Sequence, residues 1–330
     1  MRIRSSTLHE MGVNSLNDQL AKLVKTQQQI ATGRRILTPE DDPAGAALAL
    51  EQEKALGVVN QYVNNISRAR STLSLEETVL TSTSRVLQDA RQLVVSAGNP
   101  TLSSANRAVL ATTLRSHYDE LLSQANSKDG QGGYLFAGYK SSTQPFTQTT
   151  GAGTYAGDQG QLKLQINASR QIAISDSGQA LFNPGVAGSD IFATFENFIT
   201  VLNSGTISAS DLTTALTQID SAANNVLRVR ASVGTRLNEL DATEGTNLDT
   251  AFQHESSLSN IRDLDYARAI TDLTRQQTTL EARARKSASF WRAAASAICA
   301  EGRNRMCAAR VWTTLVAGIP LARRSMTLRT

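Results

Sequence analysis

The sequence predicts a mainly α-helical protein: a long antiparallel, coiled-coil-like rod that carries a small β-rich inserted domain and a divergent C-terminal tail. Two long stretches place apolar residues at alternating spacings of three and four, which is typical of helices that bury one narrow stripe. Aromatic residues are only 5% of the chain, which suits packing through Leu, Ile, Val and Ala. The expected domains are an N-terminal assembly helix (1–40), the rod (41–129 with 211–285), a β-rich outer domain (130–210) and a basic tail (286–330).

The N-terminal stretch, residues 1–37, predicts a short start followed by a helix with a thin apolar stripe. The stripe holds about one apolar residue per turn, at Leu16, Leu20, Leu23 and Ile30. Such a helix is marginal in water when alone, so it needs neighbours from its own chain or from other copies. A frayed terminal helix is the alternative.

Residues 33–43 read Gly-Arg-Arg-Ile-Leu-Thr-Pro-Glu-Asp-Asp-Pro and predict the end of one helix and the start of the next. The glycine can end the first helix, and Asp42 before the last proline suits an N-cap with proline at the first helical position. The carboxylate of Asp41 is favourable near the positive end of that helix. A cap and turn is one interpretation, and contacts of Arg34 and Arg35 with neighbouring subunits are the other.

The stretch from Ala44 to Ala97 predicts the longest helix, which ends at Gly-Asn-Pro. Its seam positions over 59–97 are mostly apolar or small: Val59, Tyr62, Ile66, Ala69, Leu73, Glu76, Leu80, Thr83, Leu87, Ala90, Val94 and Ala97. A third helix follows, with Ser103 or Ser104 as its cap. The same helical period returns over 211–280, so we expect this stretch to be the long partner.

The stretch 130–190 is rich in Gly, Ser, Thr and Gln, and its apolar residues alternate at Leu162, Leu164 and Ile166, then at Ile172 and Ile174. This pattern predicts short strands joined by turns. Chain direction then predicts the architecture: the rod runs out along 44–97, forms the β module at the far end and returns along 211–280. Both ends of the chain meet at the near end.

The charge distribution argues against a nucleic-acid-binding body. Residues 281–330 hold ten Lys and Arg against two acids, a net charge of +8; because the whole chain carries +4, residues 1–280 carry −4. The basic isoelectric point therefore describes the tail alone. Both cysteines also lie in the tail, so nothing in the first 280 residues depends on a disulfide.

No catalytic or cofactor-binding signature is found. The three histidines lie far apart in the sequence, and no Walker, G-x-S-x-G or H-E-x-x-H pattern is present. Asp263 and Asp265 are two apart on the predicted return helix, where their side chains point in different directions and make a poor acid–base pair. We expect no enzyme activity, no cofactor, no metal, no membrane span and no cleaved secretory signal.

Three separated motifs resemble the flagellar hook–filament junction proteins, the FlgL type of flagellin-like hook-associated protein. They are residues 27–46, which contain Thr-Pro-Glu-Asp-Asp-Pro; residues 129–142 with Tyr-Ala-Gly-Asp at 155–158; and residues 257–277, which contain Ile-Arg-Asp-Leu-Asp-Tyr-Ala. The match covers roughly residues 1–285, with the motifs in the family's order. Flagellin itself fits less well.

The resemblance implies a structural subunit of the bacterial flagellum, an extracellular adaptor ring between hook and filament that is needed for motility. It implies self-assembly, contacts with another hook-associated protein and with flagellin, type III export without signal cleavage, and a cytoplasmic chaperone that holds the C-terminal part. Terminal helices pair in an inner tube in this family. The implied assembly residues are Leu16, Leu20, Leu23, Ile30, Arg34, Arg35, Asp41, Asp42, Ile261, Asp263, Asp265, Tyr266, Ile270 and Leu273.

The C-terminal tail departs from the resemblance. The family's last helix ends in a short apolar run near the chain end, whereas here the pattern stops near residues 285–287 and Trp, Cys and Arg residues follow. A shifted reading frame and a genuine divergent tail are both open. For the function, a minor flagellin is the alternative within the same class, and a coiled coil that binds nucleic acid through the tail is the alternative outside it.

Overall fold

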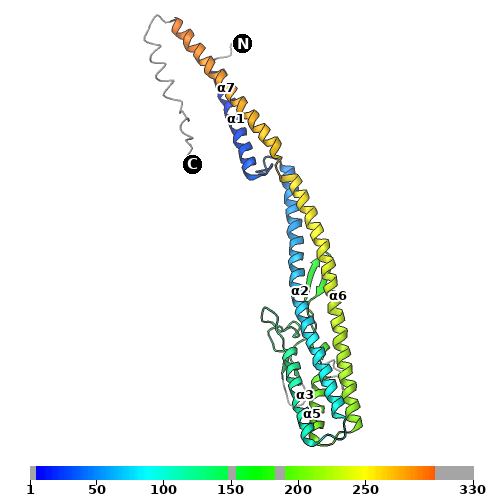
Figure 1. Ribbon diagram of the computed structural model, residues 1–330. Helices are drawn as coiled ribbons and strands as arrows, with labels where there is room; N and C mark the ends of the chain where they lie inside the picture. Colours follow the sequence, from blue (N-terminus) through cyan, green and yellow to red (C-terminus); the bar gives the residue numbers. More distant parts are fainter. Residues whose placement is uncertain (1–4, 148–153, 183–189, 302–330) are drawn as a thin grey trace, which may run out of the picture. The chain divides into compact units, whose positions relative to one another are not determined.

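The computed structural model describes residues 5–147, 154–182 and 190–301 (Figure 1). Most of this length is helix, with two small sheets, so the predicted fold class is confirmed. The elements are, in chain order, α1 (Ser5–Thr32), α2 (Pro43–Ala97), α3 (Ser104–Ala125), β1 (Phe146–Thr147), β2 (Thr154–Tyr155), β3 (Lys163–Asn167), β4 (Arg170–Ala173), α4 (Gly178–Phe182), α5 (Ile191–Ser204), α6 (Ala209–Arg262) and α7 (Tyr266–Glu301).

The chain forms two compact units. Unit 1 combines residues 1–49 with residues 259–330, and unit 2 is residues 50–258. The boundaries fall inside α2 and α6, so each of these helices contributes to both units. The two units are described separately below.

In unit 2, the predicted seam of α2 is confirmed. Eleven of its twelve positions are buried, and only Tyr62 is half-exposed. Two of the buried seam residues are polar. The Thr83 hydroxyl donates to the Gln124 side-chain oxygen of α3 at 2.9 Å, whereas neither carboxyl oxygen of Glu76 has a hydrogen-bond partner.

Ion pairs across α2 and α6 show that the two helices run antiparallel (Figure 1). Arg70 pairs with Asp241 and Glu244, Arg230 with Glu77, and Arg91 with Asp220. As the α2 partner moves from Arg70 towards the C-terminus to Arg91, the α6 partner moves from Asp241 towards the N-terminus to Asp220. These partly exposed pairs each add little stability, but together they specify one register.

The shorter helices and strands of unit 2 pack on this pair and share one core with it. Tyr118 of α3, Phe146 of β1, Phe182 of α4 and Phe192 of α5 are fully buried and in ring contact, with centroids 5.2–6.0 Å apart. These four rings form one aromatic cluster. They anchor the non-helical part of unit 2 on the rod.

The predicted strands are confirmed as an antiparallel hairpin, in which Leu164 pairs with Ile172. Side-chain amides on the long helices bind the hairpin's backbone. Asn65 of α2 donates to the Gln165 carbonyl at 2.8 Å, and the buried Asn247 of α6 donates to the Ile166 carbonyl at 2.9 Å. The hairpin is therefore docked against the rod by helix-to-carbonyl hydrogen bonds as well as by apolar contact.

Two features of the predicted architecture need correction. The β elements do not lie at the far end: β3 contacts the middle of α2 and α6, and the far end is made by the turns after α2 and α5, where Gly98 lies against Leu212. Helix α5 lies inside the domain 130–210 that was predicted to be β-rich, where no helix was predicted. It starts at the N-cap Asp190, and its apolar face fills the core.

The return stretch 211–280 is not one helix, because α6 ends at Arg262 and α7 starts at Tyr266. The third helix is confirmed, and Ser103 is its N-cap. The basic tail is described only as far as Glu301, and helix α7 runs through its predicted start at 286. The domain boundaries as a whole stay a prediction.

Candidate assembly site

Unit 1 is built around the antiparallel pairing of α1 with α7 (Figure 1). Leu16, Leu23 and Ile30 of α1 are half-buried, as is Leu273 of α7. The Arg283 guanidinium donates to the Ser15 hydroxyl at 2.5 Å and fixes the register farther along the pair. The thin stripe predicted for the first helix therefore has a partner in the same chain.

Two helix breaks face each other in unit 1. One is the loop after α1, and the other is the three-residue gap between α6 and α7. Arg34 and Asp263 form an antiparallel bridge, in which the Arg35 N–H donates to the Arg262 carbonyl at 2.7 Å and the Leu264 N–H donates to the Gly33 carbonyl at 3.0 Å. Each break thus satisfies backbone groups that the other leaves free at its helix end.

Each of these breaks ends in an aspartate that caps the next helix. Asp42 accepts from the Gly45 N–H at 2.9 Å at the start of α2, as predicted. Asp265 accepts from the Arg268 N–H at 3.1 Å at the start of α7. Asp263 and Asp265 both lie in the gap between α6 and α7 and therefore not on a helix. Asp265, the last residue of the gap, is the N-cap of α7. The prediction of both on one helix is wrong.

Glycine is required at two positions of this arrangement. Gly33 has a φ of +70°, and a Cβ there would lie 2.8 Å from the Tyr266 hydroxyl oxygen. A Cβ on Gly45 would lie 2.4 Å from an oxygen of Asp42 and 2.8 Å from the Cδ1 of Ile36, which is buried. Gly33 ends α1, as predicted. Gly45 leaves room for the side chains of Asp42 and Ile36 beside the first turn of α2.

The side chain of Arg35 binds both breaks together. Its guanidinium donates to the Ile261 carbonyl at 2.8 Å and contacts the Asp42 carboxylate at 3.3 Å, and its own carbonyl accepts from the Gln29 amide at 2.6 Å. The backbone N–H of Gly45 and the Arg35 guanidinium hold the pKa of Asp42 below its ordinary value. The charges of Arg35 and Asp42 therefore balance each other within the chain.

A second ion pair ties α1 to the same loop. The Lys25 ammonium lies 2.5 Å from the Asp41 carboxylate, whose other oxygen accepts from the Leu37 N–H at 3.1 Å. The hydrogen bond from Lys25 lowers the pKa of Asp41, and the backbone donors add to this effect. The cap-and-turn interpretation of residues 33–43 is therefore confirmed.

Apolar side chains remain exposed on the same two paired helices. We call this set the terminal face. Its members are between 41% and 65% exposed: Met11, Val13, Leu20, Val24, Tyr266 and Ile270. Val13, Leu20 and Val24 lie on one side of α1, and exposed apolar side chains that share one side of a helix indicate a surface that another protein covers.

The predicted assembly residues fall into three groups. Leu20, Tyr266 and Ile270 are exposed on the terminal face, and Arg34, Asp263 and Asp265 are exposed at the paired breaks. Half-buried positions in unit 1 make up the second group: Leu16, Leu23, Ile30, Ile261 and Leu273. The third group binds the loop within the chain: Arg35, Asp41 and Asp42. Their role between subunits stays a prediction.

Met11, Val13 and Val24 were missed as candidates because a stripe of spacing three and four counts only one face of the helix. The signal was present in the sequence: α1 carries more apolar residues than one seam can bury. Among the described residues, no cluster of three or more His, Cys, Asp or Glu side chains is arranged to hold a metal ion. None of the described helices has the length and apolar content of a membrane span.

Paired terminal helices, capped breaks and a long helical hairpin define the class of flagellin-like structural proteins. The bacterial flagellin N-terminal helical region matches residues 7–141. The flagellar hook-associated protein 3 of Escherichia coli is 34% identical over 301 residues, which cover 86% of this chain and 94% of that protein. Its counterpart in Salmonella typhimurium is 33% identical with the same coverage. The chain therefore belongs to the flagellar hook-associated protein 3 family.

Solved structures agree in fold. The flagellar hook-associated protein 3 of Legionella pneumophila has a TM-score of 0.58 at 22% identity, covering 64% of this chain and 98% of that one. FlgL of Xanthomonas campestris has a TM-score of 0.57 at 19% identity, covering 63% and 99%. The flagellin of Bacillus subtilis is less similar, at 25% identity over 292 residues, so the minor-flagellin interpretation is less favoured. The chain is a structural component of the bacterial flagellum, which is an extracellular structure.

Proposed function

We propose that this chain is the adaptor subunit between hook and filament and that it assembles through unit 1. The observation that carries the assembly role is the terminal face, where large apolar side chains on the two terminal helices remain 41–65% exposed. Burying such side chains contributes about 1.5–3 kcal/mol each. A ring of identical subunits would cover the face of one copy with the helices of the next.

The partners follow from this position in the flagellum. Copies of the same chain would form the ring, another hook-associated protein would contact it on one side, and flagellin on the other. The chain would leave the cell by type III export without loss of a signal peptide. Before export, a cytoplasmic chaperone would cover the exposed apolar residues of α7, because an uncovered apolar face promotes aggregation. No enzyme activity is part of this function.

Two leucines with equal exposure allow a sharp test. Leu20 on the terminal face is 45% exposed, and Leu227 on α6 in unit 2 is 47% exposed. Leu20→Gln and Leu227→Gln remove the same apolar surface from helices at different places. We expect L20Q to lose binding to purified hooks in a sedimentation assay, and L227Q to bind as the unchanged chain does.

The assay has clear contrary outcomes. Equal loss of binding in both variants, or a loss in L227Q alone, would move the interface away from the terminal face. Long filaments grown from this subunit alone, without flagellin, would favour the minor-flagellin role. A chain whose residues 287–330 are deleted should be run in parallel, because the two interpretations of the tail differ in whether it opposes assembly.

A further inference from the structure

Glu76 is a carboxyl group in an apolar place. It occupies a seam position of α2, is fully buried, and neither of its oxygens has a hydrogen-bond partner. An ionised carboxylate without partners in such surroundings is strongly disfavoured, whereas the neutral acid is tolerated. The structure alone therefore points to a side chain that keeps its proton near neutral pH.

The charged groups that act on Glu76 come from two other elements. Asp176 lies in the connection from β4 to α4, and Arg236 projects from α6. The Arg236 guanidinium pairs with the Asp176 carboxylate and donates to the Ala173 carbonyl at 3.0 Å, and the side chains of Arg236 and Asp176 are only 12% and 14% exposed. Three elements of unit 2 thus meet at two carboxyl groups and one guanidinium.

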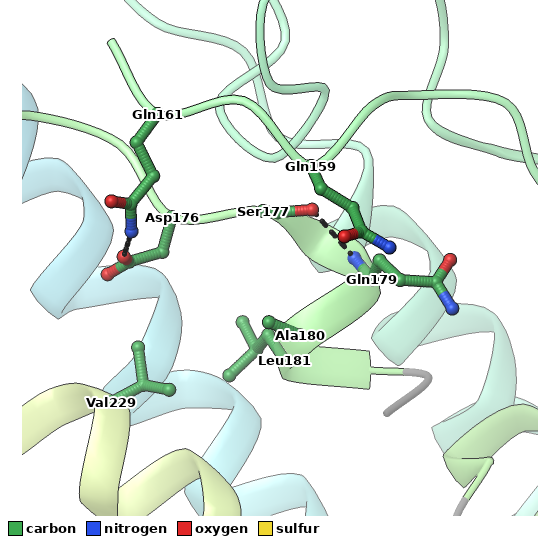
Figure 2. A pocket seen from close by; sticks show the side chains of 8 residues that line it. All are labelled: Gln159, Gln161, Asp176, Ser177, Gln179, Ala180, Leu181 and Val229. Atoms are coloured by element: carbon green, nitrogen blue, oxygen red, sulfur yellow. Dashed lines mark hydrogen bonds between the residues drawn. The ribbon is translucent and has the colours of Figure 1, made fainter. Parts of the chain in front are cut away.

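The neighbouring charges are engaged elsewhere. Glu77, the next residue on α2, pairs with Arg230 of α6, and Glu239 of α6 pairs with Arg170 of β4. Asp176 also lines a pocket beside α4, where its carboxylate accepts from the Gln161 amide at 3.0 Å (Figure 2).

We propose that Glu76, Asp176 and Arg236 form a pH-sensitive fastening that holds the β4–α4 segment, residues 173–181, on the rod. It is closed while Glu76 is neutral, because one guanidinium then balances one carboxylate. It weakens when Glu76 ionises, because two buried carboxylates then share a single cation. This fastening lies in unit 2 and does not depend on the assembly role.

The direction of the pH effect follows from the titration of Glu76. Its pKa is raised from 4.5 to about 8: burial is the largest cause, the negative charge of Asp176 acts in the same direction, and the Arg236 guanidinium opposes both. Once the segment opens, Glu76 meets water and titrates near its ordinary value. The open state therefore gains over the closed state as the pH rises from about 4.5 to about 8, and gains nothing more above that.

Amide hydrogen exchange of the full chain tests this proposal. After correction for intrinsic rates, protection of residues 173–181 should fall about tenfold per pH unit between pH 5.5 and 8 and level off above pH 8. Glu76→Gln keeps the shape without the ionisable group, so its protection should be independent of pH. Glu77→Gln, the same change one residue along, should keep the dependence of the unchanged chain.

Each result decides for or against the proposal. A flat profile in the unchanged chain, or the same slope in E76Q, would overturn it. So would loss of the slope in E77Q. If E76Q does not fold, the exchange protection of the unchanged chain and of E77Q still tests the proposal. Protection of residues 173–181 must fall as the pH rises, with no matching fall in protection at the C-terminal end of α2.

Discussion

Unit 2 and unit 1 use apolar residues in opposite ways. The buried apolar side chains of unit 2, from Ile66 in α2 to Leu240 in α6, form one contiguous core. In the described part of unit 1, the buried apolar side chains are Ile36, Ala49 and Ala269, while large ones remain exposed on α1 and α7. Because burial of apolar surface is the main stabilising term in folding, unit 2 gains much more stability from its own core than the described part of unit 1 does.

The largest expected effect is a cavity in the core of unit 2. Leu80 is fully buried in the seam of α2, so Leu80→Ala should lower the free energy of unfolding by about 2–5 kcal/mol. Urea denaturation followed by far-UV circular dichroism measures the change.

The matched control is Leu20→Ala, the same substitution on the terminal face of unit 1. A largely exposed leucine contributes little, so the free energy of unfolding of the isolated chain should change by no more than about 0.5 kcal/mol. A comparable loss in both variants would show that α1 is already buried in the free chain, and the contrast between the units would fail.

A smaller effect is expected where α6 binds the hairpin. Asn247→Ala removes the amide that donates to the Ile166 carbonyl and leaves a buried acceptor without a partner, at a cost of about 1–3 kcal/mol. Asn60→Ala is the control, because Asn60 is exposed on α2 and its loss should cost about 0.5 kcal/mol or less. If the two variants were equally stable, docking of the hairpin would rest on apolar contact alone.

The contrast between the units also explains what could be predicted from the sequence. The seam of α2 can be predicted from the spacing of its apolar residues, because a long helix places a residue on the same side at every third or fourth position. The strands at Leu164 and Ile172 follow from alternation. The contact of Asn247 with a strand far away in the sequence carries no local signal, since an isolated Asn in a helix has many possible partners.

The candidate site was predicted unevenly for a similar reason. Gly33 and Asp42 follow local capping rules, so the loop after α1 was foreseen. The gap at residues 263–265 was not foreseen, because no local sign in the sequence indicates that the helix stops there. Pairing of Asp263 with Arg34 in the other break holds these residues out of a helix. Non-local backbone pairing overrides helical propensity there.

The cap of α7 is the next test, with a smaller effect. Asp265→Ala removes the acceptor for the Arg268 N–H and should cost about 0.5–2 kcal/mol of local helix stability. Faster amide exchange in the first turn of α7, with no change in unit 2, is the expected result. Asp249→Ala, at an exposed site inside α6, is the control and should leave both units unchanged. An equal response to both substitutions would mean that Asp265 does not act as a cap.

The smallest effect, and the one that separates the units most cleanly, is their response to pH. Hydrogen bonds from Lys25 to Asp41, and from the Gly45 N–H to Asp42, lower the pKa of both acids in unit 1. Their contribution is therefore complete above the ordinary value of 3.8 and is lost as the pH falls through the lowered values. The amide resonance of Gly45, followed by nuclear magnetic resonance, should shift with a midpoint below 3.8.

Asp42→Asn is the matched variant, because its side-chain oxygen still accepts from Gly45 but does not titrate. It should keep the cap and remove the shift of the Gly45 resonance with pH. Lowering the pH below 3.8 therefore loosens the loop of unit 1, whereas in unit 2 lowering the pH from about 8 to about 4.5 favours the closed fastening, because the neutral form of Glu76 is the closed one. Loss of protection at residues 173–181 before the Gly45 shift, as the pH is lowered, would mean that the two units do not respond to protons in opposite directions.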